Sequence, residues 1–90
     1  MFRGMPEISR FLGIVIAIYW KEHGIPHFHA KYQNSRASFA IEDFRLLEGR
    51  LSPRVTGLVL EWAAGHREEL LADWSLAMEK KPLKPIAPLE

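Results

Sequence analysis

The hydrophobic pattern of the chain changes its period near residue 50. Residues 27–42 mostly alternate apolar and polar side chains, whereas residues 55–77 place apolar side chains three or four positions apart. Alternation predicts strands with one buried face, and the longer spacing predicts an amphipathic helix. We therefore expect an α+β fold in which a small antiparallel sheet of three to four strands precedes one long C-terminal helix. A length of 90 residues suits a single domain spanning 1–90.

The sheet is expected over residues 11–51, after an N-terminal lead at 1–10. The run 11–20 is apolar at both parities, which is typical of a strand covered on both faces. One helix covers only one face of such a sheet, so the other face needs the tail, a second copy or another protein as cover. The expected strands are 11–20, 27–33, 36–42 and, as an edge strand or a connection, 46–49.

The strand expected at 27–33 has one apolar face and one basic face. Side chains two residues apart share a face of a strand. The basic face carries His27, His29 and Lys31. The apolar face, which we expect to meet the helix, carries Phe28, Ala30 and Tyr32.

A single helix is expected over residues 52–81. Ser52 is a preferred N-cap, and Pro53 suits the first helical position, whereas Pro82 cannot continue the helix. Without interruption such a helix would be about 42 Å long at 1.5 Å per residue. We expect it to continue through Gly65, where a bend would keep it from overhanging so small a domain.

The tail at 82–90 has a period of three. Prolines and large apolar residues each recur at every third position, as in a polyproline II helix with one apolar edge. This edge either docks on the domain's own surface or binds a partner. The candidate partner-binding residues are Leu83, Ile86 and Leu89.

Composition narrows the function classes. The net charge of +1 shows no polyanion-binding stripe, so charge does not indicate nucleic acid binding, although RNA stays open as a substrate. The absence of cysteine excludes disulfides and thiolate metal sites, and it fits a cytoplasmic protein. The longest apolar run, 11–20, is half of what a membrane span needs. No motif indicates an organic cofactor.

Three of the four histidines, His23, His27 and His29, lie within seven residues. His27 and His29 would be roughly 6.5 Å apart on one strand face, a spacing at which both could bind a divalent metal. His23 or Glu42 would be the third ligand. Lys31 on the same face opposes this hypothesis, because its ammonium group would repel a cation.

Two other interpretations of this cluster stay open. His27 and His29 could act as general acid and base, with Lys31 stabilising the charge that develops on a phosphorane, in a ribonuclease-like arrangement. Alternatively, the histidines are structural, bonded to backbone or carboxylate groups or packed at an interface.

Five segments together resemble a known family. They are residues 5–11, the apolar strand with Gly13, Pro26-His27-Phe28-His29-Ala30, the helical stretch from Trp62 to Trp74, and the Pro-Ile-Ala-Pro-Leu close. The chain resembles the small bacterial family of domain of unknown function 4160 along nearly its whole length. Met5 matches the family's usual start, so residues 1–4 are an extension or an alternative start. Ile25 departs from the family, in which a second proline precedes Pro26.

The resemblance implies no established activity and names no catalytic residue. Members are often encoded beside another small uncharacterised protein, and a toxin–antitoxin role has been suspected. We therefore expect a protein that acts through association, with itself or with a small cognate protein, as one member of a toxin–antitoxin-like pair. The alternative is a metal-dependent or acid–base hydrolase that uses His27 and His29.

Overall fold

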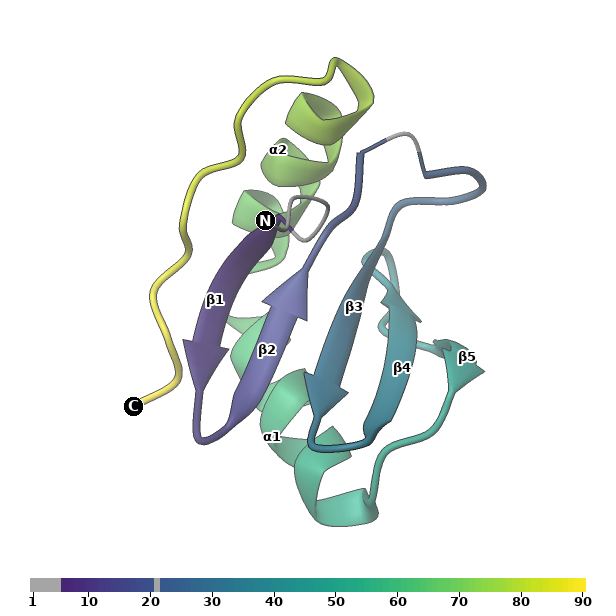
Figure 1. Cartoon of the computed structure of the whole chain (residues 1–90), viewed down its shortest axis with the longest axis vertical. Coiled ribbons are helices and arrows are strands. Elements are labelled where there is room, and N and C mark those ends of the chain that lie inside the picture. Colours follow the sequence, from purple (N-terminus) through teal and green to yellow (C-terminus); the bar gives the residue numbers. More distant parts are fainter. Residues whose placement is uncertain (1–5, 21) are drawn as a thin grey trace.

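The first half of the chain forms a five-stranded antiparallel sheet (Figure 1). The computed structural model describes residues 6–20 and 22–90. Strand order follows the sequence, and each strand pairs with the next. The α+β class is confirmed, but the expectation of three to four strands was too low. The strands are β1 (Glu7–Phe11), β2 (Ile14–Ala17), β3 (His27–Tyr32), β4 (Ser35–Ala40) and β5 (Leu46–Gly49).

The unexpected strand is β1. It occupies part of the expected N-terminal lead, of which residues 1–5 lie outside the described residues. The single strand expected at 11–20 is instead the end of β1, a tight turn and β2. Leu12 and Gly13 make this turn with φ values of 52° and 82°. Leucine rarely adopts positive φ, so the sequence lacked the Asn-Gly signal that usually marks such a turn.

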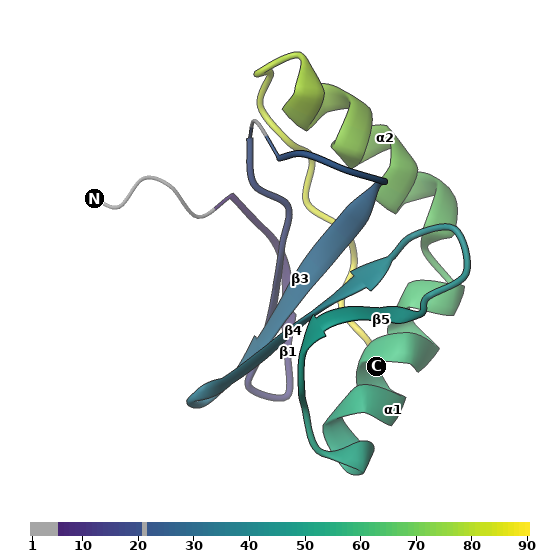
Figure 2. The same ribbon diagram turned by 90° about the vertical axis from the view of Figure 1, so that its right-hand side faces the viewer.

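The helical half contains two helices, α1 (Pro53–Ala64) and α2 (Arg67–Met78), so the prediction of one helix was wrong. Gly65 caps the end of α1. The chain leaves the helical path at the next residue, His66, whose φ is −136° and whose ψ is 25°. The break keeps both helices over the sheet in a molecule 33 Å long (Figure 2). The predicted cap is confirmed, because Ser52 Oγ accepts a hydrogen bond of 3.2 Å from the Val55 N–H. In the described part of the chain, neither helix has the length and apolar content to cross a membrane.

Both helices lie on one side of the sheet, which we call the covered face (Figure 2). The core on this side is built around aromatic rings. Phe28 lies 5.7 Å from Phe39 and 6.2 Å from Trp62, measured between ring centroids. Phe28 and Ala30 are fully buried and Tyr32 is partly buried, which confirms the predicted apolar face of β3.

The tail runs along β1 on the helix side of the molecule (Figures 1 and 2). The Ile86 N–H donates a 2.7 Å hydrogen bond to the Ile8 carbonyl, and Trp62 Nε1 donates one of 2.8 Å to the Ala87 carbonyl. Ile86 is only 4% exposed, and Leu83 and Leu89 pack against the core. The apolar edge therefore lies on the domain's own surface, while its binding of a partner stays a prediction.

The opposite side of the sheet, the open face, is covered by neither helix nor tail within residues 6–20 and 22–90 (Figure 2). It carries the alternate residues of the strands, among them His29 and Lys31 of β3 and Arg36 of β4. His27, at the start of β3, belongs to the same alternating set as His29, but its ring contacts the helical layer. Its ring centroid is 5.1 Å from that of Trp74 in α2. This contact ties one end of the open face to the helical layer.

Candidate metal centre

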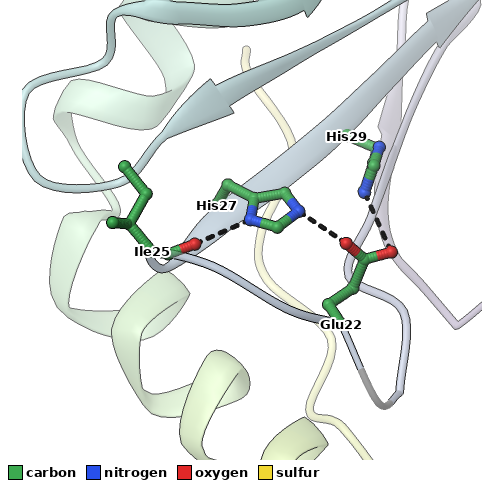
Figure 3. A network of polar contacts seen from close by, with 4 residues as sticks. All are labelled: Glu22, Ile25, His27 and His29. Carbon is green, nitrogen blue, oxygen red and sulfur yellow. Dashed lines mark hydrogen bonds and ion pairs between the residues drawn. The ribbon is translucent and has the colours of Figure 1, made fainter.

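Three side chains converge beside the start of β3. They are Glu22, from the loop that leads into the strand, and His27 and His29, from the strand itself (Figure 3). One potential ligand atom from each lies within 4.8 Å of the others. The Glu22 carboxylate is positioned between the two imidazole rings, as Figure 3 shows. We call these three residues the triad.

The ring of His27 is held at both nitrogens. Its Nδ1 is 2.7 Å from the Ile25 carbonyl oxygen, and its Nε2 is 2.7 Å from Glu22 Oε1. A carbonyl oxygen only accepts hydrogen bonds, so Nδ1 carries a proton and donates it there. The same backbone contact orients many metal-binding histidines and leaves Nε2 as the nitrogen that binds the ion.

His29 lies on the other side of the Glu22 carboxylate. Its ring centroid is 4.5 Å from that of Tyr19 and 5.1 Å from that of His27. Its Nε2 is buried and 3.6 Å from Glu22 Oε2, which is too long for a hydrogen bond. Burial, opposed by the Glu22 charge, lowers the pKa of His29. The neutral imidazole that burial favours is the form that binds metals.

The triad needs positive charge at its centre. With its proton on Nδ1, a neutral His27 turns the Nε2 lone pair toward a carboxylate oxygen 2.7 Å away. Two acceptors at that distance repel each other unless a proton or a cation lies between them. His29 Nε2 is also buried without a hydrogen-bond partner among the described residues. A single divalent cation would satisfy all three groups.

The structure separates the remaining predicted residues from the triad. His23 and Glu42 are exposed and are not part of the cluster. Lys31 lies two residues beyond His29, on the open face. The predicted metal-binding and catalytic roles of His27, His29, His23 and Lys31 stay predictions.

Sequence reasoning missed Glu22. The residue belongs to an irregular loop, in which no period fixes the direction of a side chain. Gly24, with a φ of 90°, helps the loop turn back toward β3. The available signal was an acidic residue five positions before His27, in a loop short enough to fold over the strand.

A pocket of about 410 Å³ opens on the open face next to the triad. His29 belongs to both. The polar and charged residues of the pocket wall are Tyr19, His29, Lys31, Arg36, Ser38 and Glu48. Because β3, β4 and β5 pair in register, the strands fix the spacing of His29, Lys31, Arg36, Ser38 and Glu48 in the wall.

Comparison with known proteins identifies a family. The family model described as "Domain of unknown function (DUF4160)" matches residues 13–75, which include the whole triad. Neither the curated protein sequences nor the solved structures gave a match. The match spans more than half of the chain and covers β2 to β5, α1 and most of α2. The chain therefore belongs to the family of domain of unknown function 4160.

Proposed function

We propose that the protein binds a divalent cation at Glu22, His27 and His29 and uses it to activate water, as a metal-dependent hydrolase. The observation that carries this proposal is the convergence of the three ligand atoms within 4.8 Å. Three protein ligands are typical of catalytic zinc sites, because they leave one coordination position for water or substrate.

Zinc is the first candidate ion. Two imidazole nitrogens and one carboxylate oxygen form a ligand set found in catalytic zinc sites, and the same set also suits ferrous iron. A bound zinc ion would lower the pKa of its water to about 7 and so supply hydroxide at neutral pH.

The geometry favours a ligand role over proton transfer by the two histidines. The side chain of His27 is 10% exposed, and both of its nitrogens already have partners in the protein. A general acid or base must exchange its proton with a substrate within hydrogen-bond reach. His27 is poorly placed for such an exchange, whereas a metal ligand is expected to be buried and held.

Titration calorimetry of the metal-free protein with zinc, manganese and nickel tests the site. We expect one ion per chain for the preferred metal, and at least tenfold weaker binding after Glu22→Gln, which removes a charged ligand while keeping the side chain's shape. His23→Ala is the matched control, since His23 is exposed and outside the triad. Equal affinity in Glu22→Gln and the wild type would contradict the proposal.

Hydrolysis needs its own assay. The zinc-loaded protein should cleave model esters, such as p-nitrophenyl acetate or bis(p-nitrophenyl) phosphate, faster than zinc-loaded Glu22→Gln does. Removal of zinc by a chelator should abolish this difference, and restored zinc should return it. Stoichiometric zinc binding without any such difference would indicate a structural metal and would reject the hydrolase.

A second candidate function is protein–protein association, including membership of a toxin–antitoxin-like pair. Its support is β5, the last strand of the sheet, in which Leu46 is 52% and Leu47 39% exposed. An exposed edge strand offers unpaired backbone groups to an added strand from a second copy or a small cognate protein. Native mass spectrometry of the wild type and Leu46→Lys tests self-association. A dimer lost in the variant would support it, and a monomer at every concentration would exclude it.

A further inference from the structure

Two positive side chains face each other across β3 and β4. Lys31 and Arg36 are directly opposite partners in the strand register, and both line the pocket on the open face. Neither forms an ion pair with another residue in the described part of the chain. Like charges placed directly opposite in a sheet destabilise it. The pair is therefore a cost to folding that an anionic ligand would offset.

The pocket has the size and lining of a site for one small ligand. Its volume of about 410 Å³ lies within the usual range for ligand sites. Val15 and Ala17 of β2 supply an apolar part of the wall, and Ser38 adds a hydroxyl group. His29 connects the pocket to the triad, so a bound ligand would lie next to the metal centre.

We propose that this pocket binds a small phosphate ester, with its phosphate group between Lys31 and Arg36. The guanidinium group of Arg36 suits a phosphate because it donates two parallel hydrogen bonds, and Lys31 adds a second charge. The reaction part of this inference rests on the proposed function, because it names the substrate class of the same metal centre. In that reaction the oxygen of water bonds to phosphorus and the ester P–O bond breaks. The alcohol leaves with the proton that the water gives up.

The charges favour a small ester over a long polyanion. The whole chain has a net charge of only +1, which does not favour binding along an extended nucleic acid backbone. Glu48 in the same wall would repel a second phosphate group. One phosphate on a ligand of nucleotide or sugar size fits both observations.

Calorimetric titration with inorganic phosphate, adenosine 5′-monophosphate and glucose 6-phosphate tests the inference, with the protein in both metal-free and zinc-loaded form. We expect Lys31→Ala and Arg36→Ala each to weaken binding about tenfold, because each removes a charge-assisted contact. Arg54→Ala, an exposed arginine at the start of α1, should change the affinity less than twofold.

A charge reversal separates a binding role from a structural one. Arg36→Glu replaces the repulsive pair with an attractive pair opposite Lys31, so we expect a higher melting temperature together with the loss of phosphate binding. A lower melting temperature with phosphate binding retained would overturn the inference.

The two proposals fail in different ways. Wild-type protein that binds zinc but none of the three phosphate probes would overturn the inference and leave the metal centre intact. Metal-free protein that binds phosphate through Lys31 and Arg36, yet binds no metal, would support the pocket and reject the proposed function. Binding of all three probes would identify the phosphate group as the recognised feature, whereas preference for one ester would identify its nucleoside or sugar.

Discussion

The two faces of the sheet are built from the same strands but differ in chemistry. On the covered face, Phe28 and Phe39 are buried against the helices. On the open face, His29, Lys31 and Arg36 line a pocket. Because the residues of the two faces alternate along β3, each functional side chain has a core residue as its chain neighbour. Packing on one face therefore fixes the geometry on the other.

The largest expected effect comes from Phe28→Ala, which tests this coupling. Phe28 lies between His27 and His29 in the sequence, and its side chain is fully buried. We expect the free energy of unfolding in urea to fall by about 3–5 kcal/mol. Zinc affinity should also fall, since the strand that positions His27 and His29 loses its anchor. Unchanged zinc affinity in the folded variant would show that the two faces are independent.

A smaller loss is expected at the tail. Ile86→Ala removes a buried side chain that belongs to the covered side, so we expect about 2 kcal/mol less stability in urea unfolding. Leu89→Ala, at a partly buried position, should cost less. If Ile86→Ala unfolds like the wild type, the docked tail contributes nothing to the fold, and its role as a partner-binding segment becomes the better interpretation.

Asp73 is a buried acidic residue on the covered side. The pH dependence of stability therefore tests the comparison between the two faces. Its Oδ1 accepts a 2.9 Å hydrogen bond from the Lys84 N–H, while its Oδ2 is buried without a partner among the described residues. Burial raises the pKa of Asp73, although the Lys84 N–H opposes the shift. The folded state therefore holds this proton more tightly than the unfolded state, and the associated stability is lost as pH rises through the raised pKa.

Asp73→Asn removes this charge. Relative to the wild type, we expect the variant to gain stability as pH rises from about 4 towards neutral, because a neutral amide is cheaper to bury than a carboxylate. Urea unfolding of both proteins across this range gives the difference. A difference that stays constant or shrinks with rising pH would contradict the raised pKa.

The smallest effect is expected on the open face. Lys31→Ala removes an exposed side chain and relieves its repulsion with Arg36. We expect the free energy of unfolding to stay within about 0.5 kcal/mol of the wild type or to rise slightly. A loss above about 1 kcal/mol would mean that Lys31 supports the fold, and the contrast between the two faces would weaken.

Local patterns predicted the parts of the fold that have a period or a cap. Alternation identified both faces of β3, and Ser52 marked the start of α1. One feature was missed, and a second was predicted only as a bend. Leu12 adopts positive φ because the β1–β2 pairing requires a tight turn, and Gly65 ends a helix whose apolar spacing continues past it. In both places tertiary packing, which the sequence pattern does not report, decides the backbone.

The candidate site follows the same division. The strand spacing of two brings the ring centroids of His27 and His29 to within 5.1 Å of each other. The third member, Glu22, was not predicted, because a loop side chain takes its direction from the turn around Gly24 and from the strand beneath it. His23, its neighbour in sequence, points no ligand atom into the triad. The third candidate ligand is thus Glu22, in place of the expected His23 or Glu42.

The most direct test of the metal centre is NMR of the histidine ring nitrogens, recorded on ¹⁵N-labelled protein with and without zinc. We predict that one equivalent of zinc shifts Nε2 of His27 and His29 to the metal-bound state and leaves a proton on Nδ1 of His27. The rings of His23 and His66 should not change. Zinc-induced shifts at His23 instead, or none at His27 and His29, would contradict the triad as a metal centre.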